Sequence, residues 1–529
     1  MVTLTALDFA VMAAYFAAIL ALGFWVGRGE RDALDYFLAA RNLPWYLIGF
    51  SFYASNMSGA SFVGLMGAAY QHGMTVFNYE WTATLVLIFF AVFMLPAFLR
   101  AKLFTVPEYL EVRFDRRSRW AYACLTILTL IFIDMAGAIY AGGIVMSTMF
   151  PEVSLWQAGA AMALLAGSYT LFGGLRSVVV TDAMQAVLMI VGAALIFLFG
   201  LREVGGWSAL MSGLEAAQTK LIRPAGDDFL PWPGIAGVVL LGFYYWTLNQ
   251  YFVQRALAAR SLAEGRKGAL FGGLLKLPNV FLMILPGMIA VVLLPEIENP
   301  DRVFPTLAAK LLPAGLTGLI LTALVAAIMS SLDSALNAAA SLLTMDFIRP
   351  LRPSLSGHRL LIVGRALTAL LILVAAVYAP LIARFGSLFQ YFQATLAYIV
   401  PTIVAVFLGG LFWRRMTATG AFWSLVSGLA VGLGLYLLKE VTGAWDAAGL
   451  PAVHFTYMAV AMFAFSFAVM AVVSVAAGPP ARPPGAHVAF ERSDLGAEPG
   501  AEGRGRLADY RVLAAGLAVL MVGTILAFW

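Results

Sequence analysis

The chain has few charged residues. Asp, Glu, Lys and Arg make up 12% of its 529 residues, whereas hydrophobic residues make up 62%. Soluble domains carry about 25% charged residues, so the polar fraction here is too small to cover one large soluble core. This shortage excludes a soluble globular protein and predicts a membrane protein with many spans. The net charge of +5 is small for this length and gives no reason to expect a nucleic-acid partner.

Cysteine, histidine and the common enzyme motifs are also scarce. The single cysteine, Cys124, excludes an internal disulfide. Only four histidines are present, and the sequence contains neither the H-E-x-x-H zinc motif nor the G-x-x-x-x-G-K-[ST] phosphate loop. We therefore do not expect an enzyme. A transport-derived sensor would need a soluble signalling domain, and we find no segment that suits one.

Apolar stretches long enough to cross a bilayer recur along the whole chain. Each must be helical, because the hydrocarbon core offers no hydrogen-bond partners to the backbone of a lone strand. We therefore expect an all-α, polytopic membrane protein with fourteen transmembrane helices, at residues 5–27, 43–70, 76–99, 120–149, 155–173, 179–201, 233–254, 268–294, 311–345, 360–382, 387–413, 418–438, 453–477 and 510–528.

Basic residues predict the orientation of these helices. Most of the 33 Lys and Arg residues fall in alternate loops, and those loops include Arg176, Arg255 and Arg266. Basic loops stay on the cytoplasmic side, so we expect both termini outside, in the plasma membrane or, in a Gram-negative bacterium, the inner membrane. Residues 478–506 are rich in Pro, Gly and charge and are predicted to form a flexible cytoplasmic linker.

Five charged residues fall within or at the edge of these spans, namely Glu80, Asp134, Asp182, Lys276 and Asp333. Charge at membrane depth is costly, so each is a candidate functional residue. Simpler interpretations stay open for three of them. Glu80 can be a solvated helix start, Asp182 a helix cap, and Lys276 a residue that reaches the interface along its stem.

One face of the ninth predicted span is polar. Ser330, Asp333, Ser334 and Asn337 lie at i, i+3, i+4 and i+7, and Ser331 flanks them. A set of oxygen ligands without sulfur or imidazole suits a hard cation such as Na⁺. The alternative is a polar seam of serines between helices.

Two spans are interrupted by polar or irregular runs, at residues 54–61 in the second span and 242–250 in the seventh. Broken helices at corresponding positions, five spans apart, indicate a transporter with inverted repeats. Their freed carbonyls can coordinate cations, and their ends face the substrate. Spans 2–6 and 7–11 would form the two repeats.

In these features the chain resembles the sodium:solute symporter family, and most closely its sodium/sugar cotransporter branch. The resemblance covers nearly the whole chain and is strongest at residues 58–64, 78–81, 173–185, 244–255, 330–346 and 404–413. It implies a five-plus-five inverted-repeat core of the kind found in amino-acid/sodium symporters. The implied domains are an extra helix and loop at 1–42, repeats at 43–202 and 233–413, an outer loop at 203–232, and three further helices within 414–529.

The resemblance also implies a sodium site between spans 2 and 9. It maps onto the carbonyls of Ala54, Met57 and Ala327 and the hydroxyls of Ser330 and Ser331. A second, more cytoplasmic sodium region would be formed by Asp182, Asp333 and Ser334. The carboxylate at position 333 departs from many members, so one or two coupling ions both remain open.

The resemblance also implies a substrate site, and its positions are compared with this chain one at a time. Residue types typical of sugar-binding members are kept at Glu80, Lys276, Gln393 and Tyr245, with Trp246 beside the last. Asn56 and Ser61, in the interrupted second span, complete the expected contacts, although Ser61 is shorter than the usual residue, and Gly242 replaces a small polar one.

These residues offer donors and acceptors for hydroxyl groups and aromatic faces for a ring. We therefore expect a sodium-coupled symporter for a neutral sugar or polyol that works by alternating access. The alternative is a sodium-coupled symporter for an organic anion such as a monocarboxylate or sialic acid. Lys276 would attract such an anion, but Glu80 would repel it.

Overall fold

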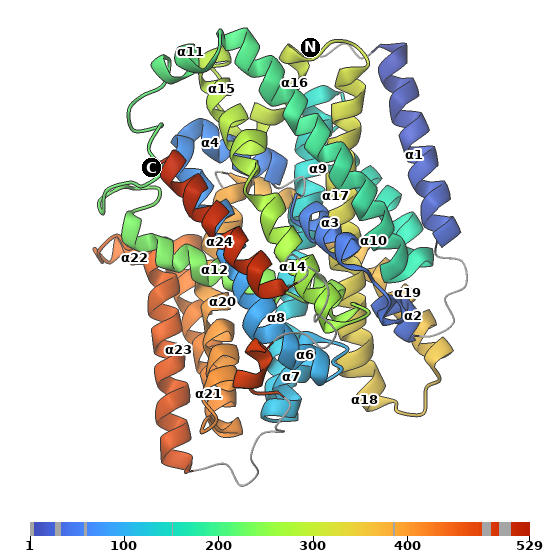
Figure 1. Cartoon of the computed structure of the whole chain (residues 1–529), viewed down its shortest axis with the longest axis vertical. Coiled ribbons are helices and arrows are strands. Elements are labelled where there is room, and N and C mark those ends of the chain that lie inside the picture. Colours follow the sequence, from blue (N-terminus) through green and yellow to red (C-terminus); the bar gives the residue numbers. More distant parts are fainter. Residues whose placement is uncertain are drawn as a thin grey trace.

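The computed structural model describes residues 5–26, 33–57, 61–150, 152–384, 387–478, 488–496 and 509–529. Within these residues the chain is helical, and the only β-type contacts are two isolated bridges. Figure 1 shows the helices packed into one bundle, with α7 and α18 near one end and α11 and α16 near the other. The all-α prediction is therefore confirmed.

The helices are numbered in chain order. Those of the first half are α1 (Ala6–Val26), α2 (Ala33–Leu38), α3 (Trp45–Asn56), α4 (Met66–His72), α5 (Asn78–Phe89), α6 (Leu95–Arg100), α7 (Val106–Arg113), α8 (Arg116–Thr129), α9 (Ala136–Met149), α10 (Leu155–Val204) and α11 (Trp207–Ser212). Those of the second half are α12 (Ile235–Thr247), α13 (Gln250–Leu257), α14 (Leu262–Lys276), α15 (Leu285–Leu293), α16 (Val303–Leu311), α17 (Leu316–Leu342), α18 (Arg349–Leu351), α19 (Gly357–Tyr378), α20 (Leu388–Phe412), α21 (Ala418–Tyr436), α22 (Ala444–Ala447), α23 (Phe455–Ala477) and α24 (Tyr510–Ala527).

Short π-helical segments extend or join several of these helices. They are η2 (Ser61–Leu65), η4 (Phe90–Met94), η5 (Leu130–Met135), η7 (Val280–Ile284), η9 (Leu343–Ile348) and η11 (Leu437–Val441). A π-segment adds a residue to a turn, shifts the faces that follow it, and is common at functional sites. Here η5 carries Asp134, and η7 begins four residues after Lys276.

Eleven helices in the described residues are long and apolar enough to cross a membrane. The three predicted spans outside this count are 43–70, 155–173 and 233–254. In the first and third, the helices α3 and α12 have only 12 and 13 residues. Their lengths of about 18 and 20 Å are well short of a hydrocarbon core of about 30 Å. Both are the spans for which interruptions were predicted.

The remaining difference concerns α10. The stretches expected at 155–173 and 179–201 belong to one helix of 50 residues, so the expected loop around Arg176 is wrong. Helical backbone continues through this position, and Arg176 is exposed on the helix. A charged residue between two apolar runs resembles a loop in sequence, but it does not interrupt helical hydrogen bonding.

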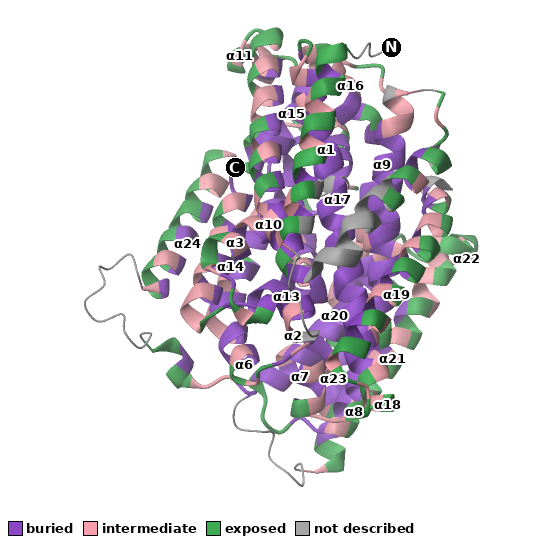
Figure 2. Ribbon diagram, turned by 90° about the vertical axis from the view of Figure 1, so that its right-hand side faces the viewer, coloured by how far each residue is buried: buried purple, intermediate pink, exposed green. Residues whose placement is uncertain are grey.

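The core lies along a few central helices. In the span that contains α17, 94% of the most apolar window is buried, whereas the corresponding value for α1 is 18%. Figure 2 shows the same contrast, with buried positions gathered along α9, α17 and α20 and exposed ones on outer helices such as α24. The α17 helix packs against α10, and α3 packs against α14. These central helices position the site.

The expected flexible linker is packed against the helices in its described part, which corrects that prediction for residues 488–496. Val488 is fully buried, and the Phe490 N–H donates to the Leu411 carbonyl at 3.2 Å. Asp494 pairs with Arg100. The rest of 479–506 lies outside the described residues. Composition alone missed this contact because Asp494 finds its partner far away in the sequence.

Candidate functional site

The first interruption lies at the end of α3. Met57 has φ −73° and ψ 55°, outside the helical region, and its N–H donates to the Tyr53 carbonyl at 2.8 Å. Residues 58–60 lie outside the described residues, and the chain is described again from η2. Ser55, in the last turn of α3, accepts a hydrogen bond at its carbonyl from the Ser331 hydroxyl of α17, at 3.1 Å. The end of α3 is therefore joined directly to α17.

The second interruption separates α12 from α13. Leu248 has non-helical angles, and the N–H groups of Leu248 and Asn249 both donate to the Tyr244 carbonyl. Asn249 then caps α13, its side chain accepting from the Tyr251 N–H. The break places Tyr245 and Trp246 in the last turn of α12, where they line a cavity.

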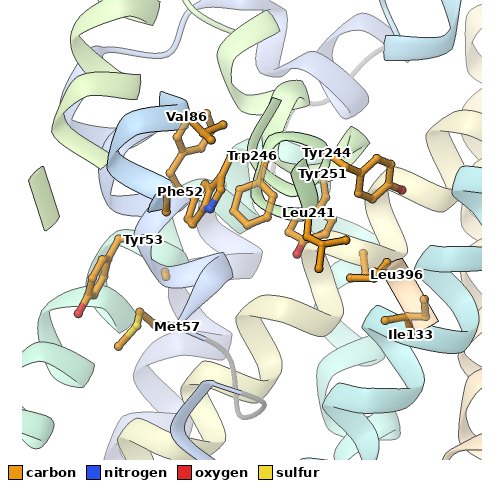
Figure 3. Close-up of a cluster of buried hydrophobic side chains, with 14 of the residues drawn as sticks. Phe52, Tyr53, Met57, Val86, Ile133, Leu241, Tyr244, Trp246, Tyr251 and Leu396 are labelled. Carbon is orange, nitrogen blue, oxygen red and sulfur yellow. The ribbon is translucent and has the colours of Figure 1, made fainter. Parts of the chain in front are cut away.

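This cavity has a volume of about 140 Å³ and lies among α3, α5, η5, α12, α13, α17 and α20. Its wall contains five of the predicted substrate residues, namely Asn56, Glu80, Tyr245, Trp246 and Gln393. Figure 3 shows Leu241, Trp246 and Tyr251 lying between the α3 residues on one side and Ile133 and Leu396 on the other. The side chain of Ser61 lies outside what the structure describes.

Lys276 lies behind this wall and is fully buried. Its Nζ is 2.5 Å from the Glu80 carboxylate and also donates to the Asn56 side-chain oxygen. The ammonium lies 5.4 Å from the centre of the Trp246 ring, within cation–π range. Asn279 donates to the same Glu80 oxygen. Burial excludes both simpler interpretations, a solvated helix start for Glu80 and a surface-reaching Lys276.

The predicted sodium residues meet where α17 contacts α3 and α10. The Ser330 hydroxyl donates to Asp182 at 2.6 Å, and the Ser334 hydroxyl donates to the Ser330 carbonyl at 2.6 Å. The hydroxyls of Ser55 and Ser334 lie 3.1 Å apart. Ala54 and Met57 are buried nearby in sequence, at the end of α3. Ala327 is one helical turn before Ser331 on α17, and its side chain lies outside what the structure describes.

Asp182 is paired with a basic residue of α13. Arg255, expected in a cytoplasmic loop, lies buried in α13 with its guanidinium 3.0 Å from the Asp182 carboxylate. The same guanidinium donates to Ser51, to Ser334 and to the Tyr251 carbonyl. Asp182 also lies in the interior of α10, so the interpretation as a helix cap is wrong.

Other predicted residues and one omission complete the site. Asp333 is fully buried on α17, and its role as a sodium ligand stays a prediction. Arg266, also expected in a loop, is buried and stacked on Tyr510. Asp134, flagged as an intramembrane charge but given no role, lines the cavity together with Tyr251. The Tyr251 hydroxyl donates to the Asp134 carboxylate at 3.4 Å.

The described residues contain no group of three or more His, Cys, Asp or Glu residues that suits a metal ion. The polar contacts where α17 meets α3 are instead made by hydroxyl and carbonyl oxygens. Oxygen donors of this kind suit a hard monovalent or divalent cation and not a soft transition metal.

The family model for the sodium:solute symporter family matches residues 36–428. The chain belongs to this family. It is therefore a multi-pass, sodium-coupled membrane transporter and not an enzyme.

Curated relatives cover most of the chain. It is 34% identical to the sodium/glucose cotransporter of Vibrio parahaemolyticus over 465 residues, which cover 82% of this chain and 85% of that protein. It is 33% identical to sodium/glucose cotransporter 4 of Danio rerio over 528 residues, covering 90% and 80%. It is 35% identical to sodium/myo-inositol cotransporter 2 of Bos taurus over 479 residues, covering 83% and 71%.

Solved structures agree on the fold. A Na⁺-coupled sialic acid symporter in a substrate-bound outward-open state superposes with a TM-score of 0.78 at 23% identity, covering 90% of this chain and 99% of the other. A nucleobase-cation-symport-1 family transporter superposes with a TM-score of 0.53 at 12% identity, covering 84% and 96%. These likenesses concern the fold alone.

Proposed function

We propose that the protein is a sodium-coupled symporter for a sugar or polyol and that it works by alternating access. The observation that carries this proposal is the cavity itself. It combines two aromatic side chains, Tyr245 and Trp246, with the hydrogen-bonding groups of Asn56, Glu80 and Gln393. A cavity of about 150 Å³ can hold a small six-membered ring, so a volume of about 140 Å³ limits the solute to about one ring in size. The sugar and inositol relatives support the same class.

Charge argues against the organic-anion alternative. In the described part of the chain, the ammonium beside the cavity is that of Lys276, and Glu80 already neutralises it. A carboxylate on the solute would have to displace Glu80 from this ion pair and leave it unpaired. Stranding a buried charge costs several kcal/mol. A solute that binds through hydroxyl groups avoids this cost, because it adds hydrogen bonds to the pair without breaking it.

We place the coupling ion at the carbonyls of Ala54, Met57 and Ala327 and the hydroxyls of Ser330 and Ser331. Support comes from the non-helical end of α3 and from the Ser331–Ser55 hydrogen bond. Asp182, Asp333 and Ser334 form our second proposed sodium region. An ion that binds there must share Asp182 with Arg255, so we expect this region to tune coupling.

The two proposed sites share a wall, which offers a route for coupling. Ser55 and Ser331 belong to the sodium region and also line the cavity. The next residue, Asn56, accepts a hydrogen bond from Lys276. An ion that draws in the Ser331 hydroxyl therefore acts on the same turn of α3 that holds the Lys276–Glu80 pair. Sodium binding would prepare the cavity for the solute through this turn.

For the topology we propose inverted repeats at 43–202 and 233–413 and both termini extracytoplasmic, in the plasma membrane or bacterial inner membrane. The two broken helices, α3 and α12, support the repeats. The loop expected inside, with α7, and the loop expected outside, with α11, lie at opposite ends of the bundle (Figure 1). The beginning of α1 lies at the end that carries α11. Residues 1–42, 203–232 and 414–529 are the flanking segments.

The test is uptake by the purified full-length chain in proteoliposomes. Labelled glucose and myo-inositol are supplied with an inward sodium gradient, with an equal potassium gradient as the control. We expect sodium-dependent accumulation that unlabelled sugars inhibit and that lactate or sialic acid does not. Accumulation that only the organic anions inhibit would overturn the substrate class. Equal uptake in potassium would overturn the coupling ion.

A further inference from the structure

The charged side chains that line the cavity in the described part of the chain are Glu80 and Asp134, and both are acidic. Glu80 is compensated, because Lys276 lies 2.5 Å away. Two other buried carboxylates near the core are compensated in the same way, Asp182 by Arg255 and Asp346 by Arg119. Each of these three acids meets a basic side chain, whereas the buried Asp8 and Asp301 are bound by backbone N–H groups.

Asp134 differs from these acids. Among the described residues it forms no ion pair, and the hydrogen bond that it receives from the Tyr251 hydroxyl is long, at 3.4 Å. It is only partly buried and is open to the cavity. The π-segment η5 shifts the helix face at this point and so contributes to presenting Asp134 to the cavity. An acid at membrane depth without a basic neighbour is by default a candidate for ligand binding.

The sodium region does not provide a cationic partner for this acid in our assignment, because its ligands belong to α3 and α17, whereas Asp134 belongs to η5. A solute in the cavity can provide that partner, because Asp134 lines the cavity. Asp134 and Glu80 line the same cavity, so both carboxylates are placed to act on the same occupant. Glu80 is already paired with Lys276, so Asp134 is the acid of the cavity wall that forms no ion pair among the described residues.

We propose that Asp134 is a specificity-determining residue that binds a protonated amine on the solute, so that the preferred substrates are amino-substituted sugars or polyols. This rests on the proposed sugar symport and narrows its substrate class. The ring would be held by the aromatic pair and the hydroxyls by Gln393 and Glu80. The ammonium would then form an ion pair with Asp134, as Lys276 does with Glu80.

The experiment measures inhibition of sodium-driven labelled glucose uptake by three ligands in proteoliposomes, namely unlabelled glucose, glucosamine and N-acetylglucosamine. Charge-assisted hydrogen bonds to an ammonium are strong, so we expect glucosamine to inhibit at a concentration roughly tenfold lower than glucose. N-acetylglucosamine keeps the nitrogen but loses the charge, and it should show no such advantage. An amino group at another ring position extends the panel if the 2-position points away from Asp134.

The matched variant is Asp134→Asn, which keeps the size and removes the charge. The readout is the ratio of the inhibitory concentrations of the amino sugar and the neutral sugar within each protein, and this ratio should fall to about one in the variant. If wild-type protein shows no advantage for any amino sugar, or if Asp134→Asn leaves the ratio unchanged, the inference is overturned while sugar symport stands. If neither class of sugar is taken up, sugar symport itself is overturned, and this inference with it.

If Asp134→Asn is inactive, inhibition of the wild-type protein by the three ligands tests the proposal without the variant. An advantage of glucosamine over both neutral analogues in wild-type protein supports an acidic contact in the cavity. Equal inhibition by the neutral ligands and by every amino sugar in the panel rules it out.

Discussion

Two buried ion pairs, Glu80–Lys276 and Asp182–Arg255, differ in what surrounds them. Glu80 and the Asn56 acceptor of Lys276 both line the cavity. Neither Asp182 nor Arg255 lines it. The Glu80–Lys276 pair therefore includes a side chain of the cavity wall, whereas neither member of the Asp182–Arg255 pair lines the cavity.

The partners of the two cations differ as well. Arg255 is bound by Ser51 of α3, Asp182 of α10, Ser334 of α17 and the Tyr251 carbonyl of its own helix. A guanidinium has five donors in a rigid plane, and this geometry fixes several elements at once. An ammonium has three donors that rotate freely, so Lys276 can adjust as the cavity fills. We infer that Arg255 positions the helices and that the Lys276 pair takes part in recognition.

Removal of Arg255 should have the largest effect. Arg255→Ala leaves Asp182 buried without its cation, and breaking a buried pair from one side costs about 3–5 kcal/mol. We expect a large loss of thermal stability in detergent, measured by a melting curve of the purified protein. The double variant Arg255→Gln, Asp182→Asn removes both charges and should recover part of that loss. A melting temperature unchanged in Arg255→Ala would contradict a positioning role.

The Ser330→Ala, Ser331→Ala double variant should lose sodium-driven uptake. Alanine provides no oxygen, and a hard cation tolerates few missing ligands. Uptake is measured against external sodium concentration, with Ser341→Ala as the matched control because Ser341 is a buried serine on the same helix without a hydrogen-bond partner among the described residues. Normal sodium dependence in the double variant would place the ion elsewhere.

Each of Glu80→Ala and Lys276→Ala should weaken sugar binding by roughly 10- to 100-fold. A lost hydrogen bond to a charged group costs about 1.5–3 kcal/mol, and the stranded partner adds to this. Because the two residues are coupled, the double variant should lose less than the sum of the two single effects. Binding is followed through the quenching of tryptophan fluorescence, which Trp246 is placed to report. Additive losses would show that the two residues act separately.

Gln393→Ala should have a smaller effect, because its amide is uncharged. A neutral hydrogen bond contributes about 0.5–1.5 kcal/mol, so the concentration for half-maximal sugar uptake should rise between about threefold and tenfold. Sodium dependence should remain that of the wild-type protein, because Gln393 lies on α20, away from the proposed ion ligands on α3 and α17. Wild-type affinity for every sugar tested would remove Gln393 from the site.

A third ion pair, at the edge of the molecule, extends the comparison to a pair that is partly exposed. Arg100 pairs with Asp494, but 34% of the Arg100 side chain is exposed. Exposed pairs contribute about 1 kcal/mol or less. Arg266 donates to the Asp494 backbone carbonyl, which a side-chain change does not remove. Asp494→Asn should therefore lower thermal stability only slightly, and a loss as large as that of Arg255→Ala would contradict the ranking.

The amino-acid sequence by itself determined the class of the protein, most of its spanning helices and most of its candidate functional residues. Runs of apolar residues predicted the spanning helices, because a bilayer leaves the backbone no other arrangement. The polar interruptions at 54–61 and 242–250 predicted where helices break, and α3 and α12 end there. The serine face of α17 followed from helical periodicity. All of these are local properties of a chain in a membrane.

Only the tertiary structure decided which charges meet. Arg255 and Asp182 are 73 positions apart in sequence, and a basic residue after an apolar run looks like part of a cytoplasmic loop until its partner is known. Asp134 could be flagged as costly, but its place on the cavity wall depends on η5, α12 and α13 packing together. Pairing depends on distances across the fold, and no local pattern contains those distances.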